Sequence, residues 1–311
     1  MRIAVIGSGA MGTVFAFRLV RAGHEVTLLA RRALYLEAAA ARGGLSVSGE
    51  GDAESGGAER VAPCRLTLDP RDLAACELAL VLVKSMHTAE AARAAAGLPP
   101  GRPVLTLQNG LGNMETLAEA LADNPVLAGV TTCAATSLGP GRSRLVSAGE
   151  TVLGPQKPED KEHAVMLAAL LTHAGFPASA TDDPRPDLWG KLLVNIAINP
   201  LTALTGLRNG EFAASAHLRS VASAAAAEGA AVASALGIAV PDAPDRFLAV
   251  CAATAANYSS MAQDMAAGRP TEIEAMNGAV GRLGRRAGVP TPVNDTLAAL
   301  VRDRETRGAA R

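Results

Sequence analysis

The chain has 311 residues, of which 49% are apolar and only 3% aromatic, and its formal net charge at pH 7 is −1. That length suffices for two domains with substantial cores, and the near-neutral charge offers no basic surface to nucleic acid or anionic lipid. The four dispersed cysteines include no CxxC pair, which argues against disulfides and against a metal cage. We expect a cytoplasmic protein without a membrane span or a bound metal.

An apolar strand over residues 3–6 runs directly into the glycine turn Gly7-x-Gly9-x-x-Gly12, and a helical stretch follows over residues 13–21. This order of strand, turn and helix is typical of a dinucleotide pyrophosphate site. Gly7 permits the tight turn, Gly9 lets the phosphates approach the backbone, and Gly12 lets the helix pack closely on the strand, while the helix N-terminus offers free N–H groups. A glycine-rich turn without a ligand is the alternative. We expect a dinucleotide to contact Gly7, Ser8, Gly9, Ala10, Met11 and Gly12.

The next predicted strand, over residues 26–30, indicates which dinucleotide is bound. An NAD-preferring site usually has a carboxylate at the end of this strand, whereas this strand ends in Arg31-Arg32 and the next acidic residue is Glu37. Guanidinium groups bind a 2′-phosphate through forked, charge-assisted hydrogen bonds. We therefore predict NADPH in preference to NADH, with Arg31 as the main candidate. The alternative is that these arginines only face solvent.

The rest of the first half alternates strands and helices, which predicts a doubly wound α/β domain. We expect strands over residues 78–83, 104–107, 126–131 and 176–181, helices over 88–96, 113–121 and 159–173, a β-hairpin over 144–153, and a loop with short edge strands over 40–62. After the proline-rich segment 182–186, only helices are predicted, punctuated by prolines. Their expected ranges are 188–199, 212–236, 245–265, 271–287 and 293–304. The active site is expected between the α/β domain and the all-α domain.

One of these helices carries Lys191, Asn195 and Asn199 at i, i+4 and i+8, so all three lie on one stripe, and the residues between them are all apolar. Burying a lysine and two amides is costly unless something polar faces them. The alternative is a solvent-facing stripe, but surface stripes favour better helix formers than asparagine. The spacing therefore favours a functional role.

A second group of polar residues lies at 257–264, and Thr271-Glu272 follows it. Asn257 and Ser260 are suited to neutral hydrogen bonds with a small polar ligand. Glu272, at the start of a predicted helix, could be catalytic or could equally be only a partner of the helix dipole.

These residues resemble those of the ketopantoate reductase (2-dehydropantoate 2-reductase) family over essentially the whole chain. The matching motifs are Gly7-Ser-Gly-Ala-Met-Gly12, Val83-Lys84, Gln108-Asn109-Gly110-Leu111-Gly112, Lys191-x3-Asn195-x3-Asn199-Pro200-Leu201-Thr202-Ala203, Asn209-Gly210-Glu211, Ser259-Ser260-Met261-x-Gln263-Asp264 and Thr271-Glu272-Ile273. The resemblance implies a Rossmann-type NADP(H)-binding domain over residues 1–182 and an all-helical substrate domain over residues 183–311.

The resemblance also implies roles for individual residues. Lys191 would donate the proton to the developing alkoxide, and Glu272 would lie beside the lysine or the cofactor ribose. Arg31 and Lys84 would lie near the adenosine end of the cofactor, and Ala135, expected in a loop at a strand end, would touch it through its backbone. The substrate would be held by Asn109, Lys191, Asn195, Asn199, Asn209, Asn257 and Ser260, with Asn109 also touching the nicotinamide.

The reaction implied is the NADPH-dependent reduction of 2-dehydropantoate to pantoate, a step of pantothenate and coenzyme A biosynthesis. Two departures from the family pattern are Cys133, where many relatives have histidine, and His87, where glutamine is common. The alternatives are a reductase of a different 2-keto acid or carbonyl and a catalytically silent NADP(H)-binding regulator. A homodimer is possible, because the alanine-rich helix over 212–236 could pack within its own domain or against a second copy.

Overall fold

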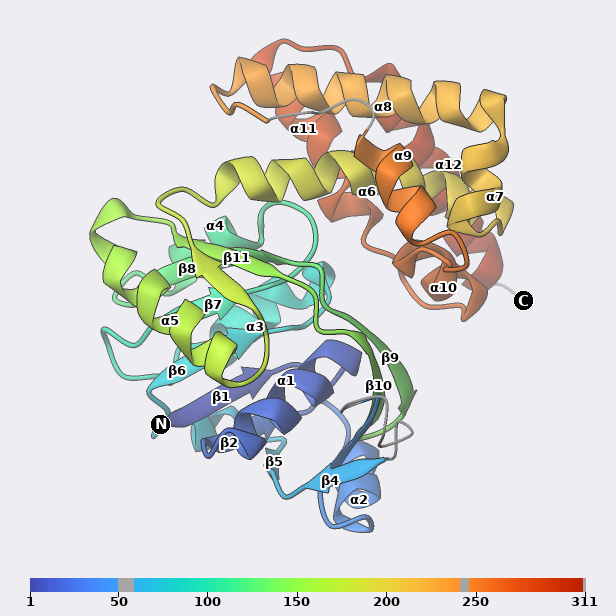
Figure 1. Cartoon of the computed structure of the whole chain (residues 1–311). Coiled ribbons are helices and arrows are strands. Elements are labelled where there is room, and N and C mark those ends of the chain that lie inside the picture. The colour runs from blue at the N-terminus through green and yellow to red at the C-terminus, as the bar shows by residue number, and fades with distance from the viewer. Residues whose placement is uncertain (50–58, 241–245, 310–311) are drawn as a thin grey trace. The chain divides into compact units, whose positions relative to one another are not determined.

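The computed structural model describes residues 1–49, 59–240 and 246–309. The chain forms two compact units, which are described separately here (Figure 1). Unit 1 comprises Met1–Gln108 and Asn113–Pro184, and unit 2 comprises Asn109–Gly112 and Arg185–Arg311. Parts of the expected loop over 40–62, and the first residue of the helix expected over 245–265, lie outside the described residues. Within the described ranges, none of the helices combines the length and the hydropathy that a membrane crossing needs.

Unit 1 is built on an eight-stranded sheet with the order β12-β11-β8-β7-β6-β1-β2-β5. Its strands are β1 (Arg2–Ile6), β2 (Glu25–Leu29), β5 (Arg65–Thr67), β6 (Leu78–Val81), β7 (Val104–Thr106), β8 (Val126–Thr131), β11 (Thr151–Pro155) and β12 (Ala178–Ala180). All pairings from β5 to β8 are parallel, and β11 is antiparallel to β8. The strand order reverses between β1 and β6, which confirms the doubly wound class. In such sheets ligands bind outside the carboxyl ends of the strands at the reversal.

The α-helices among the described residues of unit 1 are α1 (Ala10–Arg21), α2 (Ala33–Ala40), α3 (Thr88–Ala95), α4 (Asn113–Ala120) and α5 (Lys161–His173). All four residues of β6 are buried, as expected for a parallel strand covered on both faces. The ring of Phe15 on α1 stacks on that of Phe176, with 4.0 Å between the ring centroids. Helix α1 is therefore held in the core of unit 1.

A second sheet of unit 1, with the order β4-β3-β10-β9, was not predicted. Its strands are β3 (Leu45–Ser48), β4 (Arg60–Ala62), β9 (Ala134–Gly139) and β10 (Arg142–Ser147). The hairpin predicted over 144–153 is wrong, because β10 pairs with β9 and β3, whereas β11 joins the main sheet beside β8. The real hairpin turns at Gly141, whose φ is +67°. The alternating pattern of β10 was correct for a strand but did not identify its partner.

Unit 2 is all-α, as predicted, and its helices pack around α6. They are α6 (Arg185–Thr205), α7 (Asn209–Ala214), α8 (Ala216–Ala235), α9 (Arg246–Ala253), α10 (Ser260–Ala266), α11 (Asn277–Ala287) and α12 (Pro292–Ala309), with a 3-10 turn, η5 (Ile273–Ala275), before α11. Helix α8 buries a face of small residues against the other helices of unit 2, so this alanine-rich segment packs within its own domain.

Several predicted helix boundaries are wrong. Helix α6 was expected to end at Asn199, but it continues through Pro200 to Thr205. The segments 212–236, 245–265 and 271–287 were each expected to form one helix, and each is interrupted. The interruptions lie at Ser215, at residues 254–259, and at Met276, where the backbone leaves the helical conformation.

Candidate functional site

The glycine turn after β1 has the geometry of a phosphate-binding loop. Gly7 has a φ of +124°, and a Cβ at this position would lie 2.8 Å from the backbone of Leu82, just beyond β6. A Cβ at Gly12, in the first turn of α1, would collide with the carbonyl oxygen of Gly7. Both glycines are thus required by the close approach of β1, β6 and α1.

Gly9 differs from these two glycines, because nothing in the protein requires it. Its φ of −78° suits any residue, and a Cβ there would meet no atom of the described residues within 4 Å. Gly9 is the N-cap of α1, makes no side-chain capping hydrogen bond, and is followed by a first turn without acidic residues. The open space beside an uncapped helix N-terminus fits a bound pyrophosphate. Ser8, Ala10 and Met11 lie in the same turn.

Arg31, in the turn after β2, contacts a residue that follows β6. Its Nη1 lies 2.7 Å from Nε2 of His87, the last residue of the 3-10 turn η3 (Ser85–His87), and Lys84 is the N-cap of that turn. Nδ1 of His87 lies 3.5 Å from the carboxylate of Glu90. Because a guanidinium can only donate, Nε2 accepts and Nδ1 carries the hydrogen of a neutral ring.

The surroundings of His87 favour this neutral form. Burial lowers the pKa of His87 from its usual value, and the charges of Arg31 and Lys84 lower it further, while Glu90 opposes them. The sequence placed Arg31, Lys84 and His87 near the expected adenosine end of the cofactor. The structure brings Arg31 and His87 into contact, although 56 residues separate them.

A buried polar cluster at the carboxyl end of β7 was missed by sequence reasoning. Nε2 of Gln108 donates to Oγ1 of Thr88 at 2.9 Å, and that hydroxyl donates to Oδ1 of Asn113 at 2.8 Å. Thr106 in turn donates to Oε1 of Gln108. The cluster links the first residues of α3 and α4 to the end of β7, from which the segment carrying Asn109 begins. The signals in the sequence were polar residues at a strand end and the motif that begins with Gln108.

The segment Asn109–Gly112 packs on the turn that follows Glu272. The backbone N–H of Leu111 donates to the carbonyl oxygen of Ala275 at 2.8 Å. Gly110 has a φ of +82°, and a Cβ there would lie 2.5 Å from that same oxygen. Glu272, which is half-buried, is the N-cap of η5. The fold thus brings the segments that carry Asn109 and Glu272 together within unit 2.

The polar stripe on α6 is not an ordinary surface stripe. Lys191 and Asn195 are half-buried, and Asn199 is 5% exposed. Nδ2 of Asn199 contacts Sδ of Met276 at 3.5 Å, a weak hydrogen bond for a buried amide. Apolar core residues surround the stripe on α6, among them Leu192 and Ile196.

Asn209 and Asn257 lie side by side. The N–H of Asn209 donates to the carbonyl oxygen of Asn257 at 2.9 Å, and its Nδ2 donates to Oγ1 of Thr254 at 2.8 Å. Asn209 is 7% exposed, and among the described residues no partner is found for its Oδ1. A buried acceptor in this state is costly in a folded protein, so Oδ1 is suited to accept a hydrogen bond from a ligand.

The loop that carries Asn257 is tied to α6 through Ser259. The hydroxyl of Ser259 lies 2.7 Å from that of Thr202 on α6 and also accepts from the N–H of Ala262 as the N-cap of α10. Ser260 is the exposed first residue of α10. The residues expected to hold substrate therefore come from the segment Asn109–Gly112, from α6 and α7, and from the loop before α10 and the first residue of that helix, all within unit 2.

Ala135 was expected in a loop, and that expectation is wrong: it lies in β9, opposite Leu145 of β10. The expectation failed because β9 belongs to the second sheet, which was not predicted. Cys133 lies just before β9, where its N–H donates to Oγ1 of Thr131.

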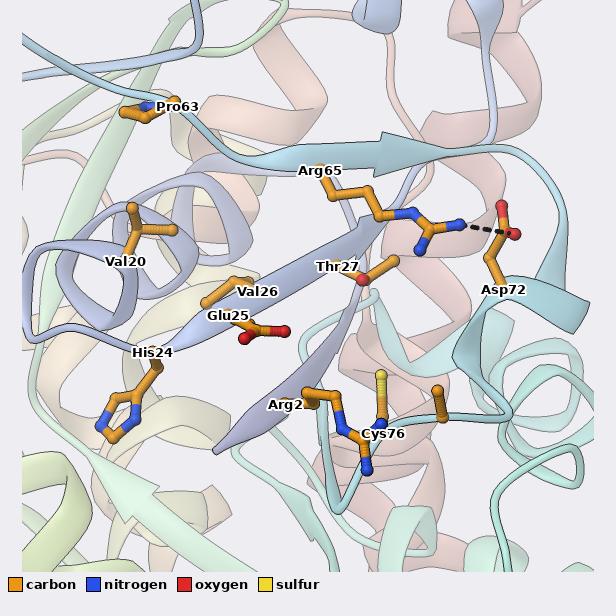
Figure 2. Close-up of a pocket in the computed structure, with 11 residues that line it drawn as sticks. Arg2, Val20, His24, Glu25, Val26, Thr27, Pro63, Arg65, Asp72 and Cys76 are labelled. Atoms are coloured by element: carbon orange, nitrogen blue, oxygen red, sulfur yellow. Dashed lines mark hydrogen bonds and ion pairs between the residues drawn. The ribbon is translucent and has the colours of Figure 1, made fainter.

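A separate cavity of about 370 Å³ lies at the amino ends of β1, β2 and β5 (Figure 2). Arg2, His24 and Arg65 contribute to its lining, and Arg65 forms an ion pair with Asp72 at 2.9 Å. Doubly wound sheets bind dinucleotides at the carboxyl ends of their strands. This cavity is at the opposite end of the sheet from the glycine turn, and we assign no part of the candidate site to it.

Family models match both halves of the chain. Residues 3–158 match the model described as ketopantoate reductase PanE/ApbA, and residues 183–305 match the model of its C-terminal domain. A 2-dehydropantoate 2-reductase of Halobacterium salinarum is 37% identical over 303 residues, which cover 97% of this chain and 98% of the relative. A 2-dehydropantoate 2-reductase of Archaeoglobus fulgidus is 36% identical, with 98% of both chains covered.

Solved structures agree with these matches in fold. A PanE/ApbA family ketopantoate reductase from Ralstonia eutropha has a TM-score of 0.89 at 35% identity, with 99% of both chains covered. D-mandelate dehydrogenase with NADH and anilino(oxo)acetate has a TM-score of 0.90 at 26% identity, also with 99% of both chains covered. The fold therefore serves more than one oxidoreductase. With family models on both halves and near full-length relatives above 30% identity, the chain belongs to the ketopantoate reductase family and is an oxidoreductase.

Proposed function

We propose that this protein reduces 2-dehydropantoate to pantoate with NADPH. The observation that carries the proposal is the stripe of Lys191, Asn195 and Asn199, which places a cation and two amides among the apolar residues of the middle of α6. The two relatives above, each named as a 2-dehydropantoate 2-reductase, support the choice of substrate.

The residues of unit 1 fit a nicotinamide dinucleotide. The uncapped N-terminus of α1 and the open space at Gly9 suit the pyrophosphate. Arg31 and Lys84, with no carboxylate at the end of β2, suit a 2′-phosphate, which favours NADPH. Asn109, Glu272 and the backbone of Ala135 are proposed as further cofactor contacts. When bound, the cofactor would supply the hydride for the carbonyl carbon.

Unit 2 would bind the keto acid and move the proton. Negative charge develops on the ketone oxygen as the carbonyl is reduced, and the ammonium of Lys191 would stabilise that charge and then donate a proton to it. Glu272 would favour the charged lysine. Oδ1 of Asn209 would accept a hydrogen bond from the hydroxyl of the substrate. The remaining contacts would come from Asn109, Asn195, Asn199, Asn257 and Ser260.

Two measurements test the proposal. Oxidation of NADPH is followed by its absorbance with 2-dehydropantoate and with a panel of other 2-keto acids, both aliphatic and aromatic. Lys191→Ala should lower kcat by about two to four orders of magnitude, the range of a general acid. Lys191→Ala with wild-type turnover would refute the role of the lysine. Asn195→Ala, which keeps the cation, should mainly raise KM for the keto acid.

A reductase of another 2-keto acid is the second candidate, and the similarity to D-mandelate dehydrogenase favours it specifically. Faster turnover of an aromatic 2-keto acid than of 2-dehydropantoate would establish it. An equal or better affinity for NADH than for NADPH would refute the assigned role of Arg31. Tight NADPH binding without turnover of any keto acid would indicate a regulator instead.

A further inference from the structure

Pro200 leaves a backbone acceptor of α6 without its usual partner. In an α-helix each carbonyl oxygen accepts from the N–H four residues later, so the partner of Ile196 would be residue 200, and proline has no N–H. Helix α6 nevertheless continues to Thr205. Ile196 is 0% exposed, so water does not reach this carbonyl from bulk solvent. An unpaired carbonyl at this depth would be costly.

The side chain of Asn277 supplies the missing donor. Its Nδ2 donates to the carbonyl oxygen of Ile196 at 3.1 Å, across 81 residues of sequence. Asn277 is itself 0% exposed, at the start of α11. Its Oδ1 has no partner among the described residues. The side-chain N–H groups of Asn277 thus donate to Ile196 and, as described next, to Asn294, while its Oδ1 accepts no hydrogen bond from the described residues.

A chain of buried hydrogen bonds extends from Asn277 to Glu228 on α8. The second N–H of Asn277 donates to Oδ1 of Asn294 at 2.9 Å, and Nδ2 of Asn294 donates to Oε2 of Glu228 at 2.8 Å. The same carboxylate accepts the backbone N–H groups of Val293 and Asn294 at the start of α12. Because a carboxylate only accepts, it orients both amides so that a donor faces Ile196.

This chain of hydrogen bonds ends between two members of the polar stripe. Ile196 directly follows Asn195, and Pro200 directly follows Asn199. Met276, the neighbour of Asn277, contacts the amide of Asn199 through its Sδ. A proline inside a helix bends it, since its ring displaces the carbonyl four residues earlier. The hydrogen bond to the carbonyl oxygen of Ile196 therefore also sets the direction of α6 from Asn195 to Asn199.

We propose that Asn277 is a positioning residue: it replaces the hydrogen bond that Pro200 removes and thereby fixes Asn199 relative to Asn195. Its effect on the reaction rests on the proposed function, in which these two amides hold the substrate. The hydrogen-bond replacement itself does not depend on any ligand.

A double-mutant cycle tests the replacement. Asn277→Ala should lower the Tm by about 3–10 °C, because it leaves the Ile196 carbonyl unpaired. Pro200→Ala restores a backbone N–H at position 200. When Asn277→Ala is made in the Pro200→Ala variant, the loss of Tm should be less than half of the loss that Asn277→Ala causes in the wild-type protein. Hydrogen exchange of the amides of residues 195–203 should accelerate in Asn277→Ala and return toward the wild-type rate in the double variant.

Steady-state kinetics show whether Asn277 positions the substrate-binding amides or only stabilises the fold. Asn277→Ala should raise KM for 2-dehydropantoate about tenfold, while kcat stays within about threefold and the Kd of NADPH is unchanged. Val301→Ala, which removes two methyl groups from a fully buried side chain on α12, is the matched control. It should lower the Tm by a similar amount without changing KM.

Additive losses of Tm in the cycle would overturn the proposal, as would an unchanged KM in an active Asn277→Ala enzyme. If the wild-type protein does not reduce 2-dehydropantoate, the proposed function fails. The cycle and the exchange rates then still decide whether Asn277 replaces the missing bond and holds residues 195–199.

Discussion

At the scale of single residues, the three glycines of the turn after β1 differ in what a side chain would meet. Gly7 and Gly12 are surrounded by backbone atoms, and Gly9 faces open space. The first two are therefore explained by folding alone. Packing among the described residues does not explain the third, so Gly9 is the position at which the proposed dinucleotide can be tested apart from folding.

This difference gives a matched pair of variants. Gly9→Ala should change the Tm by no more than about 2 °C and weaken NADPH binding about tenfold or more, because the new methyl group fills the space left for a phosphate. Gly12→Ala should destabilise the protein by about 3 kcal/mol, because its Cβ would collide with Gly7. Thermal unfolding and titration with NADPH measure both effects. Equal losses of stability would contradict the assignment.

The contact between Arg31 and His87 predicts a shift that NMR can measure. Arg31→Met should raise the pKa of His87, because the guanidinium charge is one of the causes that lower it. Arg32→Met, which removes the adjacent arginine, should have a smaller effect, and His87→Gln assigns the resonance. An unchanged pKa in Arg31→Met would show that the contact does not persist in solution.

The lowered pKa of His87 also determines how its contribution to the stability of the protein depends on pH. Because the pKa of His87 in the folded protein is lowered, the unfolded chain binds more protons in the window just below the usual histidine value of about 6.5. The contribution of His87 to stability is therefore fully present above that value and is lost as the pH falls through the window. In His87→Gln this part of the pH dependence should disappear.

Residues with local roles could be predicted from the sequence, and residues with distant partners could not. The glycine turn was predictable because its motif is local, a strand followed by Gly7-x-Gly9-x-x-Gly12 and a helix, although Gly7 also packs on the distant Leu82. The contacts of Arg31 with His87 and of Asn277 with Ile196 join segments 56 and 81 residues apart. No periodicity in the chain indicates such pairs.

At the scale of helices and strands, the errors in the predicted helices fall where candidate site residues lie. The alanine-rich composition predicted long, continuous helices. The structure interrupts them at residues 254–259, which include Asn257, before α10, and at Met276, shortly after Glu272, before α11. An interrupted helix exposes N–H groups and turns polar side chains out of the helical pattern. Local propensity therefore fails where tertiary hydrogen bonds form the site.

Two serine N-caps in unit 2 test whether the tertiary hydrogen bonds at the helix interruptions form the substrate site. Ser259→Ala removes both the cap of α10 and the hydrogen bond to Thr202 on α6, so it should cost about 1–3 kcal/mol and raise KM for the keto acid. Ser215→Ala removes only the cap of α8, where Ser215 accepts from Leu218, and should cost about 1 kcal/mol without changing KM. Urea unfolding and steady-state kinetics distinguish the two. A raised KM in both variants would mean that any loss of helix stability in unit 2 disturbs binding.

At the scale of the whole molecule, the order of α/β and all-α halves was readable because alternating and purely helical patterns follow one another along the chain. The second sheet of unit 1 was not readable, since β3 and β10 are nearly 100 residues apart and β10 is half exposed. Nor did the sequence show that Asn109–Gly112, which follows a strand of unit 1, packs with the helices of unit 2.

The packing of this segment predicts different effects for its two glycines. Gly110→Ala and Gly112→Ala both force a side chain onto a left-handed backbone, with φ of +82° and +92°, so each should cost about 1–2 kcal/mol from strain. Only a Cβ at Gly110 would press on the carbonyl oxygen of Ala275, whereas one at Gly112 meets nothing within 4 Å. Gly110→Ala should therefore lose more stability and, by displacing Asn109 from the turn that follows Glu272, also lower kcat/KM. Calorimetry and steady-state kinetics on both variants measure the difference, and equal effects would mean that contact with η5 does not position Asn109.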